Sequence, residues 1–374
     1  MKISNLLLIA FGISLFISCS NEVENDVKND VKNEVDNKKN TANGDYSNGF
    51  FILNEGGAGQ GTVSFSSNDF GVFTKDAYTA ENGSDLLGKD ATSIFFNGDN
   101  AYIIAGASDV ITVVNRYTFK LIAKIDTGLK QPRYGVVKDG KAYVINSNKY
   151  IGWGGAWDND DRDDYIAVID LATNKYESKI DLNASADRII EKDGKLYMTE
   201  FINNNDNLNL LLFVVDIATK SLETPIVITS EAYTDALSME EKDGIIYILT
   251  NNYFQKSKNK IVKVKIADNT ISRITFPEAL GEASFMDIYD DKIYYTVKNS
   301  VYAINTNATQ ATTTPIVTAP TEAFYGFAVN NNRIYLADGG DYKLDSKAYV
   351  YNLTGTLQKE LTVGVRPNGF YFNN

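Results

Sequence analysis

One short pattern recurs six times along this chain and limits what the chain can fold into. The copies are NGDNAYIIAG (97–106), KDGKAYVINS (138–147), KDGKLYMTEF (192–201), KDGIIYILTN (242–251), YDDKIYYTVK (289–298) and NNNRIYLADG (330–339). Three positions before the shared Tyr stand, in order, Asp99, Gly140, Gly194, Gly244, Asp291 and Asn332. These residue types tolerate positive φ, which a tight hairpin requires. The repeat therefore predicts the same two-stranded hairpin in six places.

A second hairpin follows each of the first ones, as in IAVIDLATNKYESKI (166–180). Asn115, Asp170 and Asp216 each precede a Thr by three residues, where an Asx side chain can cap a turn on its own backbone. Each unit is thus four short strands. No segment of ten or more residues has helical periodicity, so the fold class is all-β.

The two ends of the folded region complete one further unit. The segment 50–78 supplies only three strands, and the C-terminal VRPNGFYFNN supplies the missing innermost strand. Residues 48–374 divided among seven units give about 47 residues each, within the range of propeller blades. We therefore predict a seven-bladed β-propeller closed by the C-terminal strand. The alternative, a tandem of β-sandwiches, explains neither the single period nor the split unit.

The N-terminus has the pattern of an exported lipoprotein. Residues 1–18 are an apolar stretch behind one Lys, too short for a membrane span, and LFISC places a small residue before Cys19, the only cysteine. We expect a signal peptide over 1–18 and lipidation of Cys19, with a buried free thiol as the alternative. Residues 19–47 are Asn-rich and charged, so we expect a disordered acidic tether; the alternative is a helix with a stripe of Val.

The acidic SNEVEND after Cys19 resembles the export tags of lipoproteins on the outer face of the outer membrane, so we expect a surface-exposed location there. The lipid would be the only membrane contact. The net charge of −12 disfavours nucleic acid and anionic membrane surfaces as partners, because both require a cationic patch.

The long connections of the predicted propeller gather on one face. In antiparallel blades with strands A to D counted outward, the B–C and D–A connections share one face, and the short A–B and C–D turns share the other. Aromatic and cationic side chains concentrate in the long connections, and we expect them to bind a ligand there. The candidate residues are Trp153, Trp157, Tyr150, Phe201, Tyr253, Phe254, Tyr342, Arg133, Tyr134 and Arg366.

The same loops allow alternative roles. Trp153 and Trp157, the only tryptophans, lie in GWGGAWDNDDRDD (152–164), and they can instead pack on adjacent blades as a small core for a long loop. The acidic run at 158–164 lacks the Gly and Glu of an EF-hand, so we expect a solvated charge cluster, with a looser calcium site of oxygen ligands as the alternative. GGAGQG (56–61) joins two strands, so a dinucleotide role is not expected.

The chain contains no histidine, and this limits its chemistry. A Ser or Cys nucleophile usually needs a His base, and zinc sites commonly use His ligands. Paired carboxylates for glycoside cleavage are not marked by any spacing. We therefore expect no enzymatic activity, no catalytic residues, no cofactor and no dedicated metal site.

The blade pattern, NEGGAGQGTVSFSS (54–67) and QPRYGVV (131–137) resemble the YncE-like propeller lipoproteins with the DUF5074 domain. That resemblance implies capture of cobalamin at the cell surface and its transfer to a TonB-dependent outer-membrane transporter. Without histidine, the chain cannot replace the lower ligand of cobalt, so bound cobalamin should keep its own. The alternatives are a glycan- or protein-binding adhesion module and a structural propeller without a small ligand.

Overall fold

The computed structural model describes residues 45–147, 163–200, 209–231, 234–252, 255, 259–321 and 324–373. The chain divides into two compact units, Met1–Asn40 and Thr41–Asn374, and all described residues belong to the second. The expected signal peptide and Cys19 lie outside the described residues. Tyr46 is already part of the core, because it is 4% exposed and packs against Phe51, Phe65 and Phe119.

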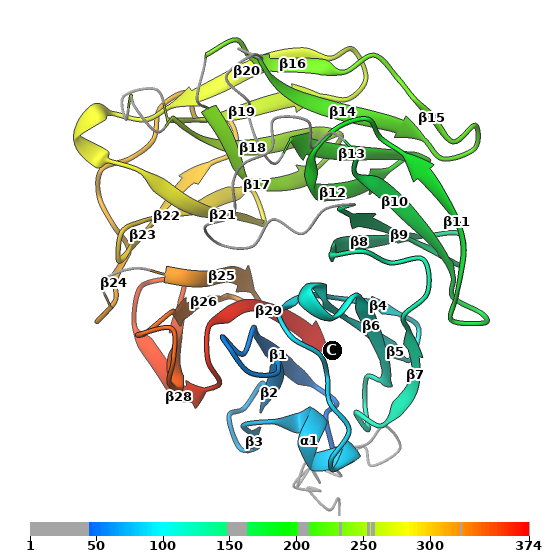
Figure 1. The fold of residues 1–374 in the computed structure, drawn as a ribbon. Coiled ribbons are helices and arrows are strands. Elements are labelled where there is room, and N and C mark those ends of the chain that lie inside the picture. Colours follow the sequence, from blue (N-terminus) through cyan, green and yellow to red (C-terminus); the bar gives the residue numbers. More distant parts are fainter. Residues whose placement is uncertain are drawn as a thin grey trace, which may run out of the picture. The chain divides into compact units, whose positions relative to one another are not determined.

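The described strands form seven antiparallel sheets, arranged as blades around a central axis (Figure 1). This arrangement confirms the predicted seven-bladed β-propeller. The innermost strands are β29 (Pro367–Asn373), β4 (Ala91–Asn97), β8 (Pro132–Lys138), β12 (Ala186–Lys192), β17 (Thr234–Lys242), β21 (Ala283–Tyr289) and β25 (Phe324–Asn330).

The second strands are β1 (Gly49–Asn54), β5 (Asn100–Ala105), β9 (Lys141–Asn146), β13 (Lys195–Glu200), β18 (Ile245–Asn252), β22 (Lys292–Val297) and β26 (Arg333–Asp338). The third are β2 (Thr62–Ser67), β6 (Val110–Asn115), β10 (Tyr165–Asp170), β14 (Leu210–Asp216), β19 (Lys260–Lys265), β23 (Ser300–Asn305) and β27 (Ser346–Asn352). The outermost are β3 (Phe73–Thr74), β7 (Leu121–Ile125), β11 (Lys175–Asp181), β15 (Ser221–Leu222) with β16 (Ile226–Thr229), β20 (Thr270–Thr275), β24 (Val317–Thr318) and β28 (Leu357–Val363).

Helical segments are short in the described part of the chain. They are α1 (Ala77–Asn82) and the 3₁₀ turns η2 (Gly106–Ser108) and η4 (Glu278–Leu280). The side chain of Asp76 caps α1 by accepting a hydrogen bond from the Thr79 backbone N–H at 3.2 Å. No helix among the described residues combines the length and the apolar character that crossing a membrane requires.

The ring closes through the C-terminal strand. β29 pairs antiparallel with β1, from Gly49 opposite Asn373 to Asn54 opposite Pro367. Asn373 is fully buried, and its side-chain amide donates hydrogen bonds to the carbonyls of Tyr46 at 2.6 Å and Arg116 at 2.9 Å. The first and last segments of the propeller are therefore tied into one blade, as the sequence predicts.

Apolar side chains fill the space between neighbouring blades. The buried residues form seven clusters, each combining side chains of two adjacent blades. Each sheet is thus covered on both faces, which explains why the second strands read as continuous apolar runs rather than alternating ones. The six repeated tyrosines belong to this core, and each is at most 6% exposed: Tyr102, Tyr143, Tyr197, Tyr247, Tyr294 and Tyr335.

The predicted turn chemistry is confirmed with one difference. Asn115, Asp170 and Asp216 accept hydrogen bonds from the backbone N–H three residues later, at 2.8 to 3.0 Å. Positive φ occurs at four of the six predicted hairpin positions: Gly140, Gly194, Gly244 and Asn332. In the other two hairpins it falls one residue earlier, on Gly98 and Asp290, because either central residue of a primed turn can adopt it.

Candidate functional site

Every innermost strand carries a β-bulge near its beginning. The register between each innermost strand and the second strand of its blade shifts by one residue. One extra residue of the innermost strand therefore has no partner in the ladder. A bulge twists the strand and redirects a side chain. Each of the seven bulges supplies one side chain to the central channel: Thr92, Tyr134, Arg188, Leu237, Phe285, Tyr325 and Asn368.

These side chains line a cavity of about 310 Å³ on the axis of the propeller. It is also lined by Glu55 just after β1 and by residues later in the innermost strands, among them Glu240, Asp287 and Tyr371. The innermost strands begin at the D–A connections, so their first residues lie near the face with the long loops. The cavity therefore opens toward the face that the sequence predicts as the binding face.

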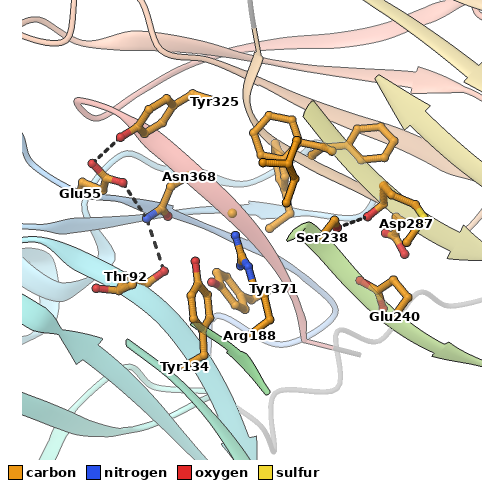
Figure 2. A pocket seen from close by; sticks show the side chains of 16 residues that line it. Glu55, Thr92, Tyr134, Arg188, Ser238, Glu240, Asp287, Tyr325, Asn368 and Tyr371 are labelled. Atoms are coloured by element: carbon orange, nitrogen blue, oxygen red, sulfur yellow. Dashed lines mark hydrogen bonds between the residues drawn. The ribbon is translucent and has the colours of Figure 1, made fainter. Parts of the chain in front are cut away.

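Hydrogen bonds join four residues at the channel mouth (Figure 2). Tyr325 donates from its hydroxyl to Oε2 of Glu55 at 2.8 Å, and Asn368 donates from Nδ2 to Oε1 at 3.3 Å. The same Nδ2 donates to the carbonyl of Ala91 at 2.8 Å and lies 3.4 Å from that of Thr92. The side-chain oxygen of Asn368 is buried and accepts no hydrogen bond from the described residues. An acceptor is thus left open at the mouth.

Burial dominates the electrostatics of the mouth. It raises the pKa of Glu55, although the hydrogen bonds from Tyr325 and Asn368 and the charge of Arg366 oppose the rise. Burial also raises the pKa of Asp90, opposed by the charges of Arg366 and Arg133. The pKa of Tyr325 is raised by burial and by the Glu55 carboxylate. The mouth thus contains acids whose charged forms are poorly solvated.

Two predicted site residues meet beside this group. The guanidinium of Arg366 lies 3.8 Å from Glu55 Oε2 and 5.4 Å from the ring centre of Tyr342. The ring of Tyr342 makes an edge contact with Tyr325, with centroids 5.4 Å apart. Tyr342 is 45% exposed, so the pair offers a cation and an aromatic surface next to the mouth. The structure thus brings Arg366 and Tyr342 together.

A second charged group lines the channel, from the bulge residues Tyr134 and Arg188 to two acids farther along their strands. Arg188 packs over the ring of Tyr134 at 4.2 Å, and its Nε lies 3.3 Å from Asp187. Burial raises the pKa of Tyr134 to about 12. Figure 2 shows Glu240 and Asp287 close together on the side of the pocket away from Glu55. Both come from the later part of their strands.

The two deep acids differ in their partners. Asp287 accepts hydrogen bonds from the backbone N–H groups of Ile288 at 2.6 Å and Val329 at 2.7 Å. Burial nevertheless raises its pKa to about 6. The pKa of Glu240 is also raised, first by burial and then by the charge of Asp287, against the opposing charge of Arg188. Protonation of either acid relieves the repulsion between them.

Arg133, also predicted for the ligand face, joins the blade of β8 to the blade of β12. Its guanidinium donates to the carbonyl of Ala186 at 3.0 Å and to the hydroxyl of Ser147 at 2.8 Å. Ser147 in turn donates to Asp164 at 2.9 Å, and the second oxygen of Asp164 accepts the backbone N–H of Ala186 at 2.8 Å. These bonds hold the guanidinium against the neighbouring blade. Tyr134, the next residue, is the one that reaches the channel.

The remaining predicted residues fall outside the described ranges, and so does most of the acidic run 158–164. They are Trp153, Trp157, Tyr150, Phe201, Tyr253 and Phe254. Within the described residues, no three or more His, Cys, Asp or Glu side chains lie together as metal ligands would.

Sequence reasoning missed most of the channel residues. The charged residues of the innermost strands ADRIIEK (186–192), TDALSMEEK (234–242) and ASFMDIY (283–289) were the available signal, because a strand at the centre of a propeller is expected to be mostly apolar. Glu55, Tyr325 and Asn368 carried no comparable signal, since their positions depend on bulges and on ring closure.

The fold is similar to that of several solved structures. A quinoprotein alcohol dehydrogenase-like protein from Bacteroides thetaiotaomicron VPI-5482 is 17% identical, with a TM-score of 0.63 over 88% of this chain and 79% of that one. The computationally designed protein Ika8 is 11% identical, with a TM-score of 0.53 over 88% and 92%. Dihydro-heme d1 dehydrogenase NirN is 13% identical, with a TM-score of 0.53 over 88% and 76%. At these identities the likeness concerns the fold alone.

No curated protein matches the chain. Residues 48–279, which are more than half of the chain, match a family model described as Domain of unknown function (DUF5074). The match begins at the first blade and confirms the resemblance noted in the sequence. The chain belongs to the DUF5074 family.

Proposed function

We propose that this protein is a lipid-anchored binding protein that captures cobalamin at the cell surface and passes it to a TonB-dependent outer-membrane transporter. The observation that carries the proposal is the set of seven bulges, which directs polar and aromatic side chains to one channel mouth on the long-loop face. Loops and strand ends held on a rigid scaffold are suited to binding.

The chemistry of the mouth is compatible with a corrin. A corrin is a broad disc with apolar faces and amide groups around its rim. The open side-chain oxygen of Asn368 can accept from an amide N–H, and Arg366 can donate to an amide carbonyl. The exposed ring of Tyr342 offers apolar contact area to a face of the disc.

Size determines how such a ligand would bind. The channel cavity, at about 310 Å³, is at the lower limit of small-molecule pockets and too small for a whole corrin. The disc would therefore lie across the mouth, with its rim over Glu55 and Asn368. In the sequence, Trp153 and Trp157 lie between β9 and β10, and we include them in the proposed contact surface.

The proposed location follows from the N-terminal sequence. Lipidation of Cys19 would anchor the mature chain, and the acidic residues after it would direct the anchor to the outer face of the outer membrane. The segment from Cys19 to just before Tyr46 would then be the tether between the lipid and the propeller, because Tyr46 already belongs to the core. Mass spectrometry of the protein from membranes would detect the diacylglyceryl group on Cys19.

Calorimetric titration of the purified protein with cobalamin tests the proposed ligand. We expect saturable binding, and an absorption spectrum of the bound corrinoid that keeps the signature of its own lower ligand. The double substitution Trp153→Ala and Trp157→Ala, and separately Arg366→Ala, should weaken binding at least tenfold, because anchor residues typically contribute about 2 kcal/mol or more.

Lys347→Ala is the matched control, since Lys347 is an exposed cation on β27 paired with Glu360. It should leave cobalamin affinity unchanged. An absence of binding heat with the folded wild type would refute cobalamin as the ligand. Tryptophan variants that lose stability but keep affinity would show that these side chains only pack the loop.

A further inference from the structure

The channel contains two side chains of opposite charge, Arg188 and Glu240, that are poorly paired among the described residues. The Nε of Arg188 lies 3.3 Å from Asp187 and is buried without a hydrogen-bond partner in the described part of the chain. The carboxyl group of Glu240 likewise accepts no hydrogen bond from the described part of the chain. Both residues line the cavity, and both are drawn in Figure 2.

Arg188 and Glu240 do not neutralise each other by direct contact. Each lies within the electrostatic field of the other, yet the two side chains are not joined as an ion pair. A guanidinium and a carboxylate that are only partly exposed and have few protein partners are available to bind charged groups of a ligand. A ligand that lies between them and carries both complementary charges would satisfy both groups.

The surroundings also define the rest of the ligand. The cavity measures about 310 Å³, which admits a molecule of amino-acid size and excludes a peptide or a sugar chain. Leu237, Phe327 and Phe370 supply apolar wall, and the rings of Tyr134 and Tyr371 border Arg188. A ligand with a short apolar side chain therefore fits this cavity better than a ligand with a third charged group.

We propose that the deep channel is a second binding site, which takes a small zwitterion of the amino-acid class with its carboxylate on Arg188 and its ammonium group on Glu240. The fork of the guanidinium matches a carboxylate in two parallel hydrogen bonds. Asp287, whose oxygens already accept two backbone N–H groups, adds negative charge near the ammonium group without direct contact. This site shares the cavity with the proposed cobalamin surface but uses other residues than those proposed to contact cobalamin.

Binding should release a proton at pH values where Glu240 is protonated in the free protein. Glu240 faces Arg188, which lies on β12, and Asp287, which lies on β21. Burial and the charge of Asp287 raise the pKa of Glu240 and favour its protonated form. An ammonium group placed beside it favours the ionised form, so the proton leaves when the ligand arrives. Calorimetry in two buffers with different ionisation enthalpies would give different apparent binding enthalpies.

Three matched probes test the charge requirement by calorimetry with the purified protein. L-Leucine carries both charges, L-leucinamide lacks the carboxylate, and N-acetyl-L-leucine lacks the ammonium group. We expect binding of L-leucine, with affinity for each of the other two at least tenfold lower. Equal binding of L-leucinamide would overturn the zwitterion site in favour of a simple cation site, and no binding of L-leucine to the folded protein would refute the site.

Two variants assign the contacts. Glu240→Gln should lower L-leucine affinity at least tenfold and abolish the buffer dependence of the enthalpy. Arg188→Lys keeps the charge but loses the bidentate fork, so it should weaken binding and leave proton release intact. The control is Glu241→Gln, because Glu241 is adjacent on β17 but interacts with Lys192 and the backbone N–H of Gly244.

If Glu240→Gln and Glu241→Gln weaken L-leucine binding equally, the assignment to Glu240 is wrong. Cobalamin titration of the same variants separates the two proposals. Loss of L-leucine binding with unchanged cobalamin binding is expected for Glu240→Gln. Failure of cobalamin to bind the wild type would refute the proposed cobalamin surface. The channel site would still be tested separately by the L-leucine titrations.

Discussion

At the scale of single residues, Arg133 illustrates how a cation near a predicted binding face can have a structural role. Its guanidinium bonds to Ala186 and Ser147 and thereby links β8 to the next blade. Removing one member of a buried charged network leaves the others without partners. We expect Arg133→Ala to lower the free energy of unfolding by about 3 kcal/mol in denaturant titrations.

The comparison for this prediction is Arg366→Ala. Arg366 has a 30% exposed side chain and lies 3.8 Å from Glu55, so its removal should cost about 1 kcal/mol or less. An Arg133→Ala variant as stable as the wild type would contradict the structural role. A loss of cobalamin affinity in that stable variant would instead support a role for Arg133 in ligand binding, as the sequence predicts.

The deep acids make stability depend on pH in a defined direction. The folded-state pKa of Asp287 is raised to about 6 from its ordinary 3.8, and that of Glu240 is raised as well. The folded protein therefore binds more protons than the unfolded chain in this window, so stability falls as pH rises from about 4 to about 6. The contribution of these groups is most favourable below that window.

Glu240→Gln should remove the part of this effect that comes from Glu240 and leave the part that comes from burial of Asp287. At pH 8 the substitution should raise the free energy of unfolding by an amount on the order of 1 kcal/mol, because it removes a buried carboxylate and its repulsion with Asp287. At about pH 4, where both acids are mostly protonated in the folded protein, it should change little. Thermal unfolding at both pH values measures the difference, with Glu241→Gln as the control. An equal effect at both pH values would contradict the assigned cause.

At the scale of elements, the strands could be predicted from the sequence but the bulges could not. A shared Tyr and a turn residue marked each hairpin, because a positive-φ requirement has a recognisable sequence signature. A bulge near the beginning of an innermost strand has no such signature here, since Thr92, Leu237 and Asn368 have little in common. Its position follows from how each strand enters the ring, which is a tertiary property.

Gly326 tests the packing of two neighbouring bulges. A Cβ added to Gly326 would lie 2.9 Å from the backbone carbon of Asn368 and 3.0 Å from the carbonyl oxygen of Pro367. Gly326→Ala should therefore push β25 away from β29 and lower the free energy of unfolding by about 1–3 kcal/mol. Chemical denaturation measures this loss.

Gly59→Ala is the control, because its Cβ would meet only the carbonyl oxygen of Gly56, at 3.3 Å, in an exposed loop. It should be nearly neutral. If Gly326→Ala were equally neutral, the close contact between β25 and β29 would be incorrect.

At the scale of the whole molecule, closure by β29 holds the two ends of the propeller together. Deletion of residues 367–374 would expose the edge of β1 and one face of the Phe50 and Tyr335 core. We expect the deleted chain to associate or unfold, and a synthetic peptide of residues 366–374 added in trans to restore the monomer. Size-exclusion chromatography would follow both, and a stable monomer without β29 would contradict the closure.

The site as a whole was partly predictable. Topology predicted that the long loops and the beginnings of the innermost strands share one face, and the structure brings Arg366 and Tyr342 together at the mouth, with Tyr134 in the channel. Arg188, Glu240 and Asp287 come from three different blades, so no local spacing in the sequence relates them. These three side chains lie close together because of the number of blades in the ring and the position of each residue along its strand.

The central claim is that the channel mouth on the long-loop face receives the ligand. Cys19 is the only cysteine, so in a Cys19→Ala background Thr92→Cys would give a single thiol at the mouth, and Ala172→Cys one on a C–D turn of the opposite face. The decisive measurement is cobalamin affinity after each thiol is coupled to a bulky maleimide. We predict at least a tenfold loss for the label at 92 and none for the label at 172; unchanged affinity with the mouth labelled would contradict the account.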